Sequence, residues 1–165
     1  MGRIPAGLKR PLHLARRFFV SLWPGGPGAA DREWVAEILS ASELVIWKRM
    51  SGADQRHAAG VARRVSQASV GERREVLAAA LLHDSGKVVS AVGTFGRVAA
   101  TLLGPARARG RLAEYLRHDV LGADLLGQAG SHPLTVAWAR EHHLAPERWS
   151  VPMEVGAVLK AADDD

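Results

Sequence analysis

One short stretch, residues 81–88, constrains this chain more than any other, because an apolar helix runs directly into polar side chains there. The preceding residues 76–82 are all apolar, which predicts a buried helix. The stretch then presents His83 and Asp84 side by side and breaks at Gly86. Imidazole and carboxylate are both ligands that first-row divalent metals accept. We expect Gly86 to adopt the left-handed conformation that closes many helices.

Lys87 follows the break and would place a positive charge beside the pair, suited to an anionic substrate. Taken alone, a His-Asp pair is equally consistent with an ordinary solvated helix end. The functional interpretation therefore depends on the other histidines.

The composition limits the type of site. A chain of 165 residues fits one domain with a sizeable core. It contains no cysteine, so disulfides and thiolate metal sites are excluded and any metal must be held by nitrogen and oxygen. There is neither an apolar run long enough to cross a bilayer nor a secretory signal, so we expect a cytoplasmic protein.

The net charge of +5 lies in the N-terminal arm, residues 1–30, which holds five basic residues and no acid. The remaining basic and acidic residues balance, which argues against a broad nucleic-acid-binding face. The Pro/Gly cluster at 24–28 predicts a boundary between this arm and a domain over 31–165. The arm has amphipathic spacing, and we expect it to pack on the domain or form a tail. A weak membrane-surface contact and a nucleic-acid contact are the alternatives, and nothing indicates the oligomeric state.

The domain itself predicts an all-α fold, because helical periodicity prevails and alternating runs are short. Asp31 is expected to cap the first helix, and Ser40 with Glu43 has the spacing of a capping box. Further helices are expected over residues 53–68, 72–84, 91–103, 112–127 and 134–143, and from about Pro152 onward.

Several potential ligands fall on apolar helical faces. His57 shares a face with Val61 and Val65, and a single such histidine is normally a hydrogen-bonded core residue. Asp163 continues the face of Leu159, and an inward carboxylate needs a partner such as a metal. The alternative is that Asp163 belongs to a frayed acidic tail. His13 and His132 are expected at the surface.

The full set of candidates is spread over separate helical stretches. It comprises His57, His83, Asp84, His118, His142, His143 and Asp163. With HDSGK at 83–87, His118 followed by Gly122 and Ala123, and the adjacent His142 and His143, the region from about 31 to 165 resembles the HD-domain superfamily of metal-dependent phosphohydrolases.

This resemblance implies a helical bundle with metal in its middle. His57, His83, Asp84 and Asp163 would hold a first divalent ion. Asp84 would bridge to a second ion held with His118, His142 and His143. Asp84 and Lys87 would be the catalytic residues, and Lys87 would bind a substrate phosphate. One or two ions are implied, with Mn, Fe, Zn, Mg and Ni not distinguished. The substrate would be a small phosphomonoester or phosphodiester, nucleotide-like in character.

The ligand order is similar to that of the HD-GYP branch, with departures. Residues 149–152, WSVP, stand where the Gly-Tyr-Pro would be, and Ala53 occupies the place of a carboxylate in a three-metal variant. Cyclic dinucleotide hydrolysis therefore loses support. Stringent-response hydrolases carry an acidic pair downstream of the motif, which residues 88–90 lack. An HD-type di-iron oxygenase and a non-catalytic metal- or nucleotide-binding sensor stay open as alternatives. Further phosphate contacts could come from Arg56, Arg117, Arg140 and Arg148.

Overall fold

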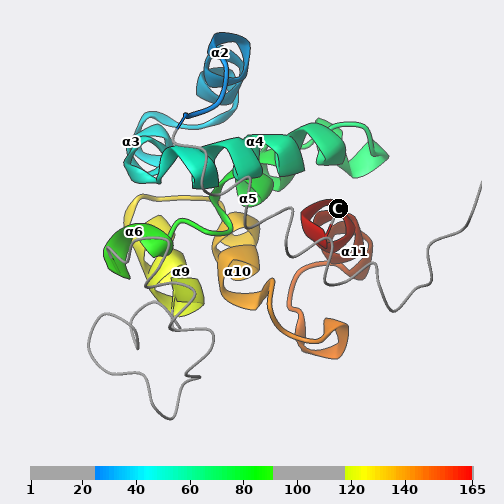
Figure 1. Cartoon of the computed structure of the whole chain (residues 1–165). Coiled ribbons are helices and arrows are strands. Elements are labelled where there is room, and N and C mark those ends of the chain that lie inside the picture. Colours follow the sequence, from blue (N-terminus) through cyan, green and yellow to red (C-terminus); the bar gives the residue numbers. More distant parts are fainter. Residues whose placement is uncertain (1–24, 91–117, 165) are drawn as a thin grey trace, which may run out of the picture.

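The structure, a computed structural model, describes residues 25–90 and 118–164, and within them it is helical with no strand (Figure 1). The helices are α2 (Ala29–Ile38), α3 (Ala41–Arg49), α4 (Gly52–Val65), α5 (Arg74–Leu82), α6 (Lys87–Ser90), α9 (His118–Gln128), α10 (Pro133–Glu141) and α11 (Met153–Asp164), with 3-10 turns η1 (Ser69–Glu72) and η2 (Pro146–Arg148). The predicted all-α fold is confirmed. The basic arm up to residue 24, with His13, and the helix expected over 91–103 lie outside the described residues, and the domain boundary near residue 30 stays a prediction.

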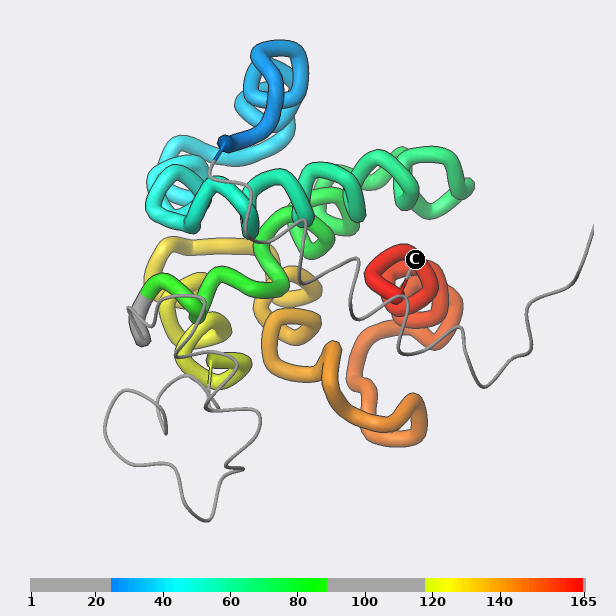
Figure 2. The backbone as a smooth tube through the Cα atoms, in the orientation of Figure 1, coloured from blue at the N-terminus to red at the C-terminus, as the bar shows by residue number. Residues whose placement is uncertain are grey.

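Helix α5 forms the centre of the bundle. It packs against α4 and α10 and also touches α2, α3 and α11. In Figure 2 the chain can be followed by colour from α4 into α5, and α10 (orange) and α11 (red) lie near α5. Most of its side chains are buried, as expected for a helix that is apolar on nearly every face.

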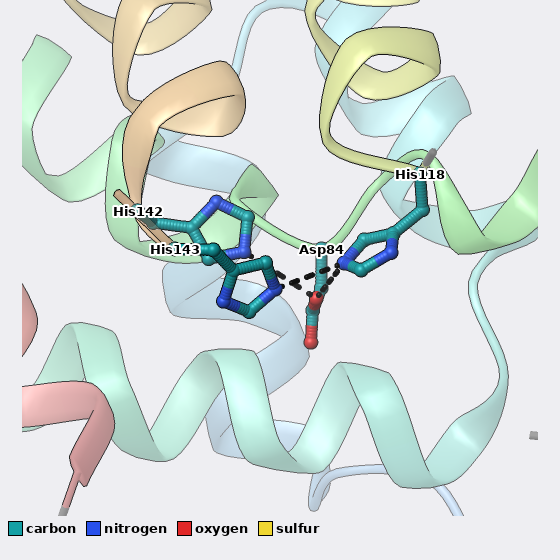
Figure 3. A group of neighbouring side chains, drawn as sticks. All are labelled: Asp84, His118, His142 and His143. Atoms are coloured by element: carbon teal, nitrogen blue, oxygen red, sulfur yellow. Dashed lines mark hydrogen bonds and ion pairs between the residues drawn. The ribbon is translucent and has the colours of Figure 1, made fainter. Parts of the chain in front are cut away.

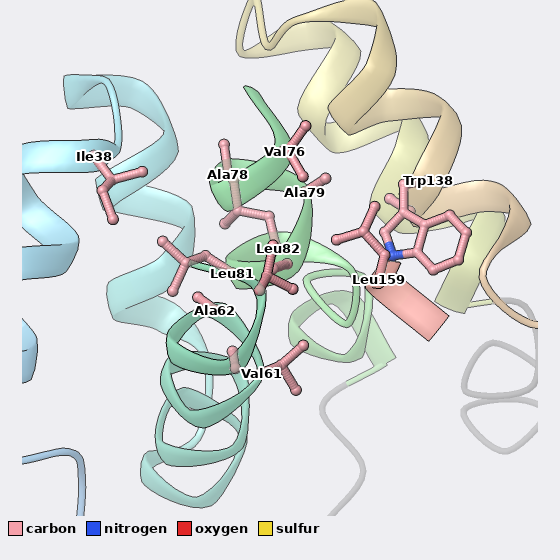
Figure 4. Close-up of a cluster of buried hydrophobic side chains, with 14 of the residues drawn as sticks. Ile38, Val61, Ala62, Val76, Ala78, Ala79, Leu81, Leu82, Trp138 and Leu159 are labelled. Carbon is pink, nitrogen blue, oxygen red and sulfur yellow. The ribbon is translucent and has the colours of Figure 1, made fainter. Parts of the chain in front are cut away.

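The core fills the spaces around this central helix. Figure 4 shows Leu81 and Leu82 of α5 among Val61 of α4, Trp138 of α10 and Leu159 of α11, all almost fully buried. Burying such side chains contributes about 1.5–3 kcal/mol each. The apolar packing thus fixes where these helices lie, and most of the site is built at their ends, with His57 inside α4.

Local sequence signals set several helix starts. The capping box of Ser40 and Glu43 is present at α3, with both reciprocal hydrogen bonds. The prediction that Asp31 caps the first helix was wrong: the N-cap is Gly28, and Asp31 lies in the first turn, where Arg63 donates to its carboxylate. Its charge still favours the helix start through the helix dipole.

No helix among the described residues has both the length and the apolar character that crossing a bilayer requires.

Candidate metal centre

The polar stretch after α5 enters the interior. His83 forms the C-cap of α5 in right-handed helical geometry, and both His83 and Asp84 are buried. The expected left-handed turn at Gly86 is wrong, because Gly130 is the one described glycine with a positive φ, 74°. Gly86 is required for another reason: a Cβ there would lie 1.8 Å from the carbonyl oxygen of His118. The absence of a side chain lets the start of α9 come close enough to bring His118 to Asp84.

A first cluster joins three helices that are distant in the sequence. His57 comes from α4, His83 from the end of α5 and Asp163 from the last turn of α11. The Oδ1 atom of Asp163 lies 2.8 Å from Nε2 of His57 and 3.7 Å from Nε2 of His83. Asp163 is buried and helical, so the alternative of a frayed acidic tail does not describe it.

A second cluster contains Asp84, His118, His142 and His143 (Figure 3). Oδ1 of Asp84 lies 3.5 Å from Nε2 of His118 and 3.9 Å from Nε2 of His142. Nε2 of His143 lies 3.2 Å from Nε2 of His118. All seven predicted candidates therefore converge, in two adjoining groups.

Asp84 connects the groups because its two oxygens face different histidines. Oδ2 lies 3.5 Å from Nε2 of His83, on the first cluster's side, while Oδ1 faces His118 and His142. A carboxylate in this position has one oxygen available to each of two ions.

The imidazole tautomers suit metal binding. Nδ1 of His83 lies 2.9 Å from the carbonyl oxygen of Ala80, and Nδ1 of His142 lies 3.0 Å from that of Ala139. A carbonyl can only accept, so each Nδ1 carries the hydrogen and each Nε2 keeps its lone pair. Nε2 of His142 is buried and has no hydrogen-bond partner among the described residues. An orphaned buried lone pair pointing at a carboxylate fits a metal ligand, and such backbone bonds to the second ring nitrogen are usual in metal sites.

Comparison with known families agrees with this geometry. The model of the HD domain family matches residues 55–164, about two thirds of the chain. The chain belongs to the HD domain family. Neither the curated proteins nor the solved structures gave a match to it. HD domains are typically metal-dependent hydrolases, and the two clusters of this HD domain could hold metal ions.

The electrostatics of the HD centre keep its carboxylates ionised. Burial works to raise the pKa of Asp84, but the charge of Lys87, with smaller contributions from the His83 and His118 imidazoles, holds that pKa well below its usual range. The pKa of Asp163 is likewise lowered, with burial opposed mainly by the hydrogen bond from His57.

Two of the histidines of the second cluster, His142 and His143, have lowered pKa values. Burial, together with the nearby imidazoles of His83 and His143, lowers the pKa of His142 to about 2. Burial also lowers the pKa of His143, with the His118 imidazole next in importance. Ionised carboxylates beside neutral imidazoles are the protonation states that a divalent cation needs.

Lys87 lies at the edge of the HD centre and forms an ion pair with Oδ2 of Asp84. Its predicted role as a phosphate ligand stays a prediction, and it requires the ammonium group to turn from Asp84 toward the substrate.

The remaining sequence candidates lie elsewhere. Arg140 pairs with Asp124 at the surface, and Arg148 is exposed. His132 is exposed as predicted, and its Nδ1 accepts a hydrogen bond from the backbone N–H of Leu134 at the start of α10. Arg117 lies outside the described residues.

Two supporting residues of the HD centre had no role assigned from the sequence. Arg64 donates to the carbonyl oxygen of Ala162, beside Asp163, and Glu141 holds the loop that follows His143. The spacing of seven between His57 and Arg64, which places both on one face of α4, was the available signal for Arg64.

Proposed function

We propose that this HD domain is a metal-dependent phosphohydrolase that cleaves a small phosphate ester with metal-activated water. The observation that carries the proposal is the placement of Asp84 between the two histidine clusters, with one oxygen directed to each. A pair of ions sharing a carboxylate is the arrangement that phosphoryl transfer to water exploits.

The donor set assigns the ligands. His57, His83 and Asp163 would hold the first ion, and His118, His142 and His143 the second, with Asp84 shared. Bound there, two divalent ions would lower the pKa of a coordinated water toward 7 and neutralise phosphoryl oxygens.

The chain's own contribution is to orient these ligands and control access. His83 and His142 are buried and their rings are fixed by backbone carbonyls, so they keep their positions without substrate. His57 and His143 are the more accessible ligands, with 27% of the His57 side chain exposed. A substrate would therefore approach the side of the centre where His57 and His143 lie.

Lys87 would supply positive charge to this reaction. Its side chain is 17% exposed, so the ammonium group can leave Oδ2 of Asp84 for a phosphoryl oxygen without crossing the core. A fixed cation beside the scissile phosphate would stabilise the charge that develops there.

The test pairs metal analysis with a substrate panel. We would quantify bound metal in the purified chain and assay phosphomonoesters, phosphodiesters and nucleotides after loading with Mn²⁺. Phosphate release by the wild type, with both metal and activity lost in Asp84→Ala, would support the proposal. Metal binding with oxygen consumption and no phosphate release would instead favour the oxygenase chemistry that similar ligand sets support. A folded protein that binds no metal would refute both.

A further inference from the structure

The loop that follows the paired histidines is fastened by one carboxylate. Glu141, the last residue of α10, accepts two hydrogen bonds from Ser150: the backbone N–H donates to Oε2 at 2.7 Å and the hydroxyl donates to Oε1 at 2.6 Å. Both carboxylate oxygens of Glu141 thus accept hydrogen bonds from the same residue, nine positions further along the chain. Charge-assisted bonds of this kind are stronger and more directional than neutral ones.

His143 needs such support more than the buried imidazoles of His83 and His142 do. The rings of His83 and His142 are held by backbone carbonyls through Nδ1. His143 is exposed, and the polar contact of its Nε2 is with another ligand candidate, Nε2 of His118 at 3.2 Å. The position of the His143 ring therefore depends on the backbone turn that carries it, in which the N–H of Leu144 donates to the carbonyl of Glu141.

Trp149 anchors the far end of the same loop. Its Nε1–H donates to the carbonyl oxygen of Leu144 at 3.2 Å. Its ring meets Trp138 edge-on, with centroids 5.4 Å apart, and lies so close to α11 that a Cβ on Gly156 would be 2.5 Å from it. Ser150, the residue next to Trp149, is thus held in place. Its hydrogen bonds to Glu141 tie the turn at His142 and His143 to this anchored part of the loop.

We propose that Glu141 is a positioning residue for the second metal ion, acting through Ser150 and the His143 turn without touching the ion. This inference rests on the proposed metal-dependent function and adds a determinant of whether the centre holds one ion or two. Residues that orient metal ligands typically affect metal affinity by about 10–100-fold when removed.

The experiment titrates the full chain with Mn²⁺ alone and follows free Mn²⁺ by electron paramagnetic resonance. Glu141→Gln keeps the size of the side chain, but its NH2 group cannot accept the bond that one carboxylate oxygen accepts from Ser150, and the charge that strengthens both bonds is lost. The matched control is Glu147→Gln, which removes the same charge from an exposed residue of the same loop that makes no hydrogen bond or ion pair within the described part of the chain.

We expect the dissociation constant of the second ion, the one whose site His142→Ala removes, to rise about tenfold or more in Glu141→Gln. The other site should be unchanged, and Glu147→Gln should match the wild type at both sites. Ser150→Ala, which deletes only the hydroxyl bond, should weaken the same site by less, and Ser150→Thr should restore it. The affected site is assigned with His142→Ala, whose remaining Mn²⁺ site should match the one that Glu141→Gln leaves intact.

Equal binding of two ions by Glu141→Gln and Glu147→Gln would overturn the positioning role and leave the proposed function standing. A wild type that binds no Mn²⁺ would overturn both. If circular dichroism shows that Glu141→Gln does not fold, Ser150→Ala decides the question: wild-type affinity for the second ion in that variant overturns the inference.

Discussion

Replacing Gly86 with alanine is expected to disable the second cluster by a purely steric route. An added Cβ would lie 1.8 Å from the carbonyl oxygen of His118 and 2.6 Å from the amide nitrogen of Gly122. Ordinary contacts begin near 3.4 Å, so the turn and the start of α9 would have to separate by about 1.6 Å. Metal-ligand distances tolerate deviations of only about 0.2 Å, so His118 and Asp84 could no longer share an ion.

The expected result is a loss of about 10–100-fold in affinity for the second ion, together with a stability cost of about 1–3 kcal/mol from overpacking. Mn²⁺ titration and thermal unfolding measure the two effects separately. The control is Gly127→Ala in the same helix, where a Cβ meets nothing within 4 Å. That variant should keep both ions and gain about 0.5–1 kcal/mol of stability. Two ions bound by Gly86→Ala as tightly as by the wild type would refute the close-approach argument.

Three further predictions concern Lys87, Arg64 and His142. Lys87→Ala should keep the metal content but lower the turnover of phosphate esters, and unchanged steady-state kinetics would exclude a role in substrate binding. Arg64→Ala should weaken the first ion about tenfold, because the guanidinium then no longer holds the helix-end carbonyl beside Asp163; Arg63→Ala, which loses the same charge at the α2 contact, should not. The metal-free protein should lose stability as pH falls below about 6.5. In that range His142 is protonated in the unfolded state but stays neutral in the folded state, where its pKa is about 2. His142 therefore lowers the free energy of unfolding by about 1.4 kcal/mol for each unit that the pH falls between 6 and 4. Thermal unfolding of His142→Asn should show a shallower pH dependence than that of the wild type.

The ligand set was predictable because it depends on helical periodicity, which is local. His57 and Asp163 each continue an apolar face of their own helix, so the same packing that builds the core turns both inward. The order of histidines and carboxylates along the chain then identified the family, and the family match confirms it.

The supports of the site were not predictable in the same way, because they join residues that only the tertiary fold brings together. Gly86 was expected to serve a left-handed turn, whereas its role is set by α9, which local sequence around the turn does not reveal. Neither Arg64 nor Glu141 was assigned a role from the sequence, because the partner of Arg64 is a carbonyl on α11 and the partner of Glu141 is a residue beyond a 3-10 turn. Asp31 illustrates the opposite limit: cap preference alone misplaced the helix start by three positions.

The most direct test of the metal centre is anomalous diffraction at the manganese edge from crystals of the full chain grown with Mn²⁺. The account predicts two peaks, one among His57, His83 and Asp163 and one among His118, His142 and His143, with Asp84 touching both. Peaks found only at the protein surface, or density for water in place of both ions at saturating Mn²⁺, would contradict it.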